Sequence, residues 1–145
     1  MKISIEKISN KLEEEILIRC HEVDEEIREI ISKLKTEPLK IVGYQNDKVH
    51  LIVLKNIYYF EAVDGKVFLY CEDNVFEVKQ KLYELEKICK EKDFFRATKS
   101  TILNIAKISS VHPSFSGRFE ALLDNGERVV ISRKYVPVLK KVLGL

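Results

Sequence analysis

At the centre of the chain stands Ile57-Tyr58-Tyr59-Phe60-Glu61-Ala62-Val63-Asp64-Gly65-Lys66-Val67-Phe68-Leu69-Tyr70-Cys71, in which two apolar runs flank Asp64-Gly65. β-Branched and aromatic residues fill both runs, as is typical of strands in a half-buried sheet. Asp-Gly is a strong two-residue hairpin signal, because the turns that match the twist of paired strands need positive φ. The stretch therefore predicts an antiparallel hairpin within a β-rich fold.

The same pattern of short strands and turns continues on both sides of this hairpin. Before it we predict strands over 39–44 and 49–54 with a turn at Asn46-Asp47, and after it a turn at Asp73-Asn74 and a strand over 75–78. Further strands are predicted at 94–95, 102–105, 108–111, 119–123 and 129–131, with turns at Ser116-Gly117 and Asp124-Asn125-Gly126. About ten short strands result from these patterns.

Helical periodicity occurs in three places. The apolar stripes lie within 24–35 (Ile27, Ile30, Ile31, Leu34), 79–91 (Leu82, Leu85, Ile88, Cys89) and 135–143 (Tyr135, Val138, Leu139, Val142, Leu143). Asp24 is placed to cap the first helix, and Pro137 fits only in the first turn of the last one. Together with the strands, these helices predict a β-dominated α+β fold.

The N-terminal segment differs in pattern from the rest. Residues 14–20 predict a strand, and the helix after it ends at Thr36-Glu37-Pro38, because a proline pushes the preceding residue out of the α region. We therefore expect a strand–helix extension over 1–38 and a main domain over 39–145. The extension has too little apolar surface to fold alone, so it either completes the main fold or mediates self-association.

The modest net charge of +2 conceals an uneven distribution. Residues 92–145 carry ten Lys/Arg against four Asp/Glu, whereas residues 1–91 carry 15 against 19. This balance favours a polyanionic partner for the C-terminal third, although a solvated basic face explains it equally well. The absence of a signal sequence or membrane-length apolar run, with three unpatterned cysteines, predicts a cytoplasmic protein with reduced thiols.

Little in the sequence indicates catalysis. The three histidines lie far apart, no glycine-rich loop is present to cradle phosphate, and no nucleophile has an assignable base. We expect no enzymatic activity, no metal site and no cofactor.

Two segments combine cations and hydroxyls at the ends of apolar strands. One runs from Phe94 to Asn104 and contains Thr98-Lys99-Ser100, and the other runs from Asp124 to Tyr135 and contains Ser132-Arg133-Lys134. Such groups can bond guanine edges and phosphates in DNA. Simpler interpretations are that Ser132 caps the last helix, that the neighbouring cations are solvated, and that Phe94 and Phe95 belong to the core.

These two segments resemble the LytTR DNA-binding family. The resemblance rests on Phe95-Arg96-x-x-Lys99-Ser100-x-Ile102-Leu103-Asn104, on Asn125-Gly126 followed by Ile131-Ser132-Arg133-Lys134-Tyr135, and on Ile57-Tyr58-Tyr59-Phe60-Glu61-Ala62. In the family, the corresponding strings are F-x-R-x-H-R-S-Y-x-V-N, N-G with S-R-x-Y, and I-x-Y-I-E-A. The match covers roughly residues 40–145, and its blocks occur in the family's order.

The resemblance implies an elongated arrangement of small antiparallel sheets that sets loops into successive major grooves of DNA. The DNA-binding positions it implies are Lys66, Thr98, Lys99, Ser100, Arg133 and Lys134, with Val67 beside the first, whereas Asn104 is expected to be structural. Thr98-Lys99 replaces the family's usual His-Arg pair, and Thr101 replaces its aromatic residue. Because lysine lacks arginine's planar fork, the preferred bases are expected to differ.

The sequence therefore predicts a sequence-specific regulator of transcription that binds double-stranded DNA, with a homodimer on two repeated half-sites as the expected assembly. The family's frequent receiver domain has no room in 38 residues, so the chain resembles stand-alone members, which often act beside a small membrane protein. The alternative is a β-rich protein-interaction or ligand-sensing module with an incidental basic face. RNA binding is less favoured, because the aromatic residues cluster in apolar runs.

Overall fold

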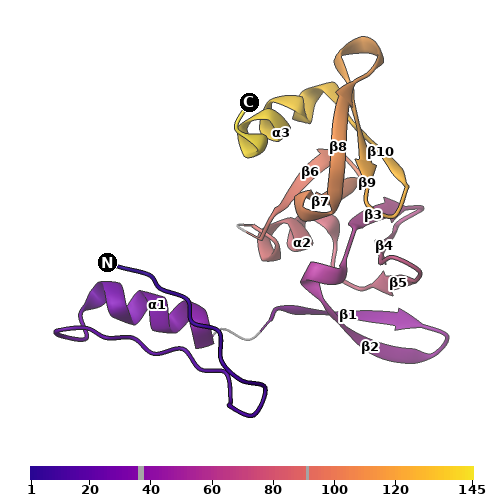
Figure 1. The fold of residues 1–145 in the computed structure, drawn as a ribbon. Helices are drawn as coiled ribbons and strands as arrows, with labels where there is room; N and C mark the ends of the chain where they lie inside the picture. Colours follow the sequence, from indigo (N-terminus) through magenta and orange to yellow (C-terminus); the bar gives the residue numbers. More distant parts are fainter. Residues whose placement is uncertain (36–37, 91) are drawn as a thin grey trace. The chain divides into compact units, whose positions relative to one another are not determined.

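The computed structural model describes residues 1–35, 38–90 and 92–145, and the chain divides into two compact units, Met1–Glu37 and Pro38–Leu145 (Figure 1). Secondary structure in the second unit is dominated by antiparallel strands, with two short α-helices and several single turns of 3-10 helix. The β-dominated α+β fold expected from the sequence is confirmed. None of the described helices is long and apolar enough to cross a membrane.

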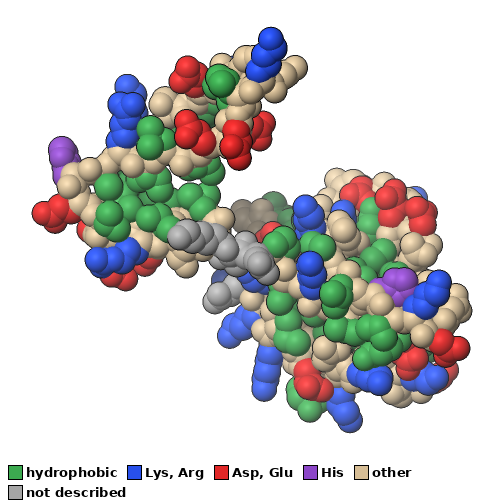
Figure 2. Space-filling model, turned by 90° about the horizontal axis from the view of Figure 1, so that it is seen from below, with side chains coloured by type: hydrophobic (Ala, Val, Ile, Leu, Met, Phe, Trp, Pro, Cys, Tyr) green, Lys and Arg blue, Asp and Glu red, His purple; other side chains and the backbone are tan. Residues whose placement is uncertain are grey.

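The first unit contains one helix, α1 (Glu25–Lys35). Asp24 caps it as expected, because its Oδ1 accepts a hydrogen bond from the backbone N–H of Ile27 at 3.0 Å. Ile27 is the only buried residue among those described in this unit, and Ile30 and Ile31 are half-buried. Figure 2 shows hydrophobic side chains gathered on this unit with acidic side chains around them.

The strand predicted over 14–20 was wrong. These residues have no regular secondary structure, although the helix that follows them begins after Asp24 as predicted. The predicted helix end at Thr36-Glu37-Pro38 falls partly outside the described residues. A strand is stable only when a neighbouring strand pairs with its backbone N–H and C=O groups. The described part of the first unit offers no such neighbour, so apolar content alone does not make this segment a strand.

The larger sheet of the second unit has seven antiparallel strands in the order β2-β1-β5-β4-β3-β7-β6. Their bounds are β1 Lys40–Gln45, β2 Lys48–Val53, β3 Tyr59–Val63, β4 Lys66–Tyr70, β5 Val75–Val78, β6 Phe94–Thr98 and β7 Thr101–Asn104. The two-residue turns Asn46-Asp47 and Asp64-Gly65 both have positive φ at each position, as the hairpin prediction required. Helix α2 (Leu82–Ile88) connects β5 with β6.

The smaller sheet has the strand order β10-β9-β8. Its strands are β8 Ile108–Pro113, β9 Phe119–Leu123 and β10 Arg128–Ile131. A 3-10 turn, η4 (Arg133–Tyr135), leads from β10 into the terminal helix α3 (Val136–Leu143). Pro137 lies in the first turn of α3 as predicted, and Gly144 ends the helix in a left-handed conformation.

Two hydrophobic clusters form, and strands β3, β6 and β7 contribute to both. Phe60 and Ile102 belong to the cluster that includes Leu82 and Leu85 of α2. Phe95 and Leu103 belong to the other, formed with the smaller sheet and α3. Successive side chains of a strand point to opposite faces, so these strands bury both faces and need nearly continuous apolar residues. Phe94 and Phe95 are therefore core residues rather than exposed stacking platforms.

Candidate nucleic-acid interface

The polar loop between β6 and β7 consists of Thr98, Lys99 and Ser100. The Thr98 Oγ1 accepts a hydrogen bond from the Ser100 backbone N–H at 3.1 Å and lies 3.3 Å from the Ser100 hydroxyl. These contacts close a tight local turn of the kind that short hydroxyl side chains favour. The Lys99 side chain is left exposed at the tip, and no carboxylate in the described structure forms an ion pair with it.

Arg96 connects this loop with helix α2 through hydrogen bonds. Its Nη1 donates a hydrogen bond to the carbonyl oxygen of Lys99 at 2.6 Å, while Nε and Nη2 donate to one carboxylate oxygen of Glu86 at 3.1 and 2.7 Å. Its side chain is 16% exposed. One planar guanidinium therefore joins helix α2 to the tip of the loop, which a point charge could not do in the same geometry.

The residue that follows β10 is hydrogen-bonded to β6 directly before the polar loop. The backbone N–H of Ser132 donates to the carbonyl oxygen of Ala97 at 2.9 Å, and the Ser132 hydroxyl donates to the same oxygen at 3.3 Å. Ser132 makes no side-chain cap to the turn that follows it, so the capping interpretation was wrong. Because Ala97 precedes the polar loop, this contact places the exposed Arg133 near that loop.

Lys66 begins β4 directly after the central hairpin turn, opposite Val63 of β3. The other side of β3 meets the polar loop, since the Ala62 N–H donates to the Ser100 carbonyl oxygen at 2.9 Å. Lys66, the Thr98–Ser100 loop and Arg133 thus come from three distant stretches of sequence to one end of the larger sheet. Lys134 follows Arg133, but its ammonium lies 5.4 Å from the centre of the Tyr135 ring.

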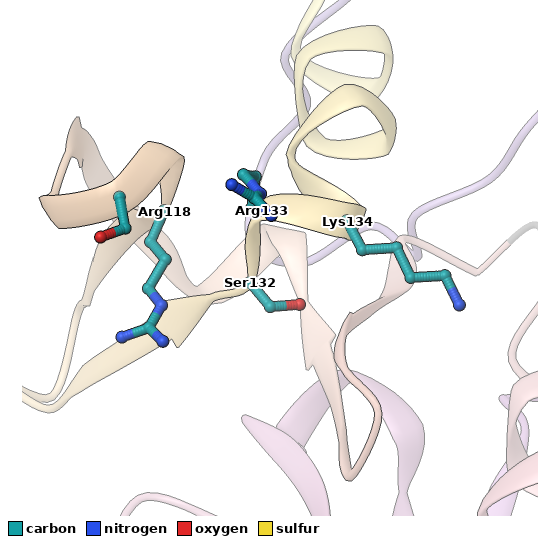
Figure 3. Close-up of a pocket in the computed structure, with 5 residues that line it drawn as sticks. Arg118, Ser132, Arg133 and Lys134 are labelled. Carbon is teal, nitrogen blue, oxygen red and sulfur yellow. The ribbon is translucent and has the colours of Figure 1, made fainter.

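Sequence reasoning missed two residues at this end of the molecule. Ser116 and Arg118 line an open depression of about 420 Å³ together with Ser132, Arg133 and Lys134 (Figure 3). The available signals were the Ser116-Gly117 turn and the position of Arg118 in the basic C-terminal third. Neither signal connects the β8–β9 turn with Arg133, which lies beyond the next two strands.

Some cations of the second unit form an ion pair or lie over an aromatic ring, and others do neither. Arg128 pairs with Glu120 at 2.9 Å, and Lys79, Lys107 and Lys140 lie over aromatic rings. The described structure gives no ion pair or ring contact to Lys66, Lys99, Arg118 or Arg133, nor to some lysines elsewhere, such as Lys48 and Lys87. Exposed cations without internal partners are the groups that a polyanion can engage without breaking an existing contact.

Two polar contacts stabilise the opposite end of strands β3 and β7, away from the polar loop. Asn104 is buried, and its Nδ2 donates to the Ile57 carbonyl oxygen at 2.8 Å while its Oδ1 accepts from the Ala106 N–H at 3.0 Å. Asn104 is therefore structural, as expected. The Tyr58 hydroxyl donates to Asp124, and this hydrogen bond with burial raises the Tyr58 pKa to about 12.

Comparison with known proteins assigns most of the second unit to a family. The family model described as the LytTr DNA-binding domain matches residues 47–144. The Sensory transduction protein LytT of Enterococcus faecalis is 29% identical over 77% of this chain and 45% of its own length, and that of Bacillus anthracis is 31% identical over 68% and 40%. The chain thus spans less than half the length of these relatives.

Two further similarities extend the comparison. An uncharacterized HTH-type transcriptional regulator of Staphylococcus aureus is 25% identical over all of this chain and 99% of its own length. The solved LytTr DNA-binding domain of a putative methyl-accepting/DNA response regulator from Bacillus cereus covers 76% of this chain with a TM-score of 0.71 and 27% identity. That structure is matched over its full length. The chain belongs to the LytTR family of DNA-binding domains.

Proposed function

We propose that this protein is a transcriptional regulator that binds double-stranded DNA sequence-specifically, reads major grooves through loops at strand ends, and performs no catalysis. Its site of action is the cytoplasm, where a bacterial-type regulator meets the chromosome. The observation that carries the proposal is the convergence of Lys66, the Thr98–Ser100 loop and Arg133 at one end of the larger sheet. Main-chain hydrogen bonds hold these three segments together.

The chemistry of each segment suggests a separate role. Arg133 can donate a pair of hydrogen bonds to O6 and N7 of a guanine, and Lys99 can reach a base edge as a single point of charge. The hydroxyls of Thr98 and Ser100 suit phosphate oxygens or base edges, and Lys66 and Lys134 suit phosphates. Arg133→Ala is then expected to lower the affinity by about 1–3 kcal/mol and to relax selectivity at one base pair.

We further propose that residues 1–38 mediate a homodimer that binds two repeated half-sites. Among the described residues of the first unit only Ile27 is buried, while Ile3, Ile5, Ile16 and Leu17 are each more than two-thirds exposed. So much exposed apolar surface on a small unit favours burial against a second copy. A membrane-protein partner stays a prediction from the family resemblance alone.

The dimer is tested in the full-length chain by Ile30→Glu with Ile31→Glu, which places two carboxylates on the apolar face of α1. Sedimentation velocity is expected to show a change from dimer to monomer, with weaker binding to a two-site duplex. Lys33→Glu, on an exposed position of the same helix, is the control and should leave the dimer intact. A wild-type monomer, or a double variant that still sediments as a dimer, contradicts this assembly.

The main test is selection of bound duplexes from a random pool, followed by affinity measurements on the winner at several salt concentrations. Enrichment of one motif, bound far more tightly than random DNA, is the expected result. Weak binding without enrichment that vanishes as salt rises would refute sequence-specific recognition. It would favour the interaction-module alternative instead.

A charge-reversal pair tests the location of the interface. Lys99→Glu with Arg133→Glu is expected to abolish duplex binding while thermal unfolding stays near that of the wild type, because both side chains are exposed. Lys48→Glu with Lys87→Glu is the matched control, since it changes the net charge equally at exposed positions on β2 and α2. Equal loss of binding in both pairs would mean that only overall charge matters.

A further inference from the structure

The turn between β8 and β9 has a fixed and unusual backbone. Ser116 and Gly117 both have positive φ, 57° and 76°. Two backbone hydrogen bonds close the turn, from the Ser114 N–H to the Arg118 carbonyl oxygen at 2.7 Å and from the Arg118 N–H to the Phe115 carbonyl oxygen at 3.2 Å. The turn therefore holds Arg118 in a defined position directly before β9.

Gly117 lies directly against the side chain of Arg133. A Cβ atom at position 117 would come within 2.9 Å of Arg133 Cδ and 3.1 Å of its Cγ. The other glycines with positive φ, including Gly126, have no atom within 4 Å of such a Cβ. The aliphatic part of Arg133 thus packs on the turn, and the absence of a side chain at position 117 permits that contact.

The depression beside this contact is cationic and open. Arg118 and Arg133 approach it from different elements, whereas the Lys134 side chain extends away from Arg118 in Figure 3. In the described structure no carboxylate pairs with either arginine, although Arg96 and Arg128 each pair with a glutamate. Two unneutralised guanidinium groups beside the Ser116 hydroxyl make a site that favours an anion with several oxygen acceptors.

We propose that the β8–β9 turn is a further DNA-binding segment, in which Arg118 and the Ser116 hydroxyl bind one backbone phosphate next to the base that Arg133 reads. Gly117 is the positioning residue that lets the Arg133 side chain lie along the turn. This inference rests on the proposed DNA-binding function and deepens it. A phosphate is the natural ligand here, because phosphodiesters flank every base pair that a strand-end arginine can reach.

The test uses the full-length protein and its selected duplex, with each phosphate replaced in turn by an uncharged methylphosphonate. The wild type is expected to lose about tenfold in affinity at one phosphate per half-site. Arg118→Ala is expected to lose a similar factor in affinity for unmodified DNA. Its affinity should not fall further when the methylphosphonate stands at that phosphate. Each lost phosphate contact should also lower the slope of log affinity against log salt concentration by about 0.9. Arg118→Lys should restore part of the affinity.

Arg128→Ala is the matched control, because Arg128 lies in the same small sheet but pairs with Glu120. It is expected to bind as the wild type does. The inference is overturned if Arg118→Ala binds like the wild type, or if Arg118→Ala remains fully sensitive to the same methylphosphonate. If the wild type prefers no duplex, the proposed function fails and the inference fails with it.

A second arm separates a DNA phosphate from free phosphate. Inorganic phosphate is titrated into the protein against chloride at equal ionic strength, while NMR follows the Arg118 Nε–Hε signal. Weak or undetectable binding, with a position-specific methylphosphonate effect, supports the DNA assignment. Saturable binding that Arg118→Ala abolishes, with no methylphosphonate effect at any position, would assign the depression to a free anion and overturn the proposal.

The positioning role of Gly117 has its own comparison. Gly117→Ala and Gly126→Ala each put a Cβ on a backbone with positive φ, but only the first meets Arg133. Discrimination between the selected duplex and one altered at the base read by Arg133 is expected to fall about tenfold in Gly117→Ala and to stay unchanged in Gly126→Ala. Equal discrimination in the two variants would contradict the positioning role.

Discussion

Replacing Arg96 by alanine should weaken DNA binding even though Arg96 is not among the proposed DNA-binding residues. The change removes the hydrogen bond from Nη1 to the Lys99 carbonyl oxygen and the two contacts with Glu86. A hydrogen bond from a charged donor contributes about 1.5–3 kcal/mol, and the contact with a half-exposed glutamate contributes at most about 1 kcal/mol. We expect Arg96→Ala to lower the free energy of unfolding by about 2–3 kcal/mol.

The effect on DNA binding follows from the freedom that Lys99 gains. Thr98 and Ser100 keep their mutual contacts, and the Ser100 carbonyl keeps its hydrogen bond from Ala62. Binding must then order about one additional residue, which opposes it by about 1–2 kcal/mol. The dissociation constant for the selected duplex should therefore rise by roughly five- to thirty-fold.

Fluorescence anisotropy titration of a labelled duplex measures this change, and urea unfolding measures the stability of the same samples. The salt dependence of binding should not change, because no contact between Arg96 and a phosphate is lost. Glu86→Gln is the control, since it removes the ion pair but leaves the bond to Lys99. The reasoning is refuted if Arg96→Ala loses stability without losing affinity, or if its salt slope falls by about one.

Three other substitutions test interactions elsewhere in the second unit. Asn104→Ala leaves the Ile57 carbonyl and the Ala106 N–H without partners and should lower the free energy of urea unfolding by about 2–4 kcal/mol; a loss below about 1 kcal/mol would contradict its structural role. Gly43→Ala would place a Cβ 2.6 Å from Ile52 Cδ1 and 2.8 Å from Phe76 Cβ. We expect it to lower the free energy of unfolding, measured by thermal unfolding, by about 1–3 kcal/mol. Unchanged stability would show that the neighbouring side chains move to accept the methyl group. Because the hydrogen bond to Asp124 and burial raise the Tyr58 pKa from 10.0 to about 12, the folded state retains this proton more strongly than the unfolded state. The resulting stability is complete below pH 10 and disappears as the pH rises towards 12, so Tyr58→Phe should flatten this part of the stability–pH curve, and parallel curves would disprove the linkage.

Local signals predicted much of the second unit. The turns Asn46-Asp47 and Asp64-Gly65 need positive φ, and Asn, Asp and Gly are the residue types that favour such turns. Pro137 could begin a helix but not continue one, which fixed the start of α3. Such elements were predictable because the deciding interactions lie within a few residues.

Long-range interactions were not predictable in the same way. The segment over 14–20 has strand-like composition but no partner strand, and composition does not reveal a missing partner. Arg96 was part of a recognised motif, yet its bonds to Glu86 depend on how α2 packs beside β6. Arg118 and Arg133 line one depression only because the β8–β9 turn lies against Arg133. Each of these outcomes depends on how one element packs or pairs with another.

The loops at the end of the larger sheet are joined mainly through peptide groups. Ala62 bonds to Ser100, and Ser132 bonds through its own N–H to Ala97, so the identities of the neighbouring exposed side chains contribute little to the folded shape. Natural variation can therefore exchange the residues at positions 66, 99 and 133 one at a time, with each intermediate still folded. A scaffold of this kind can acquire a new operator by gradual steps, and related regulators in one genome can diverge in target without diverging in architecture.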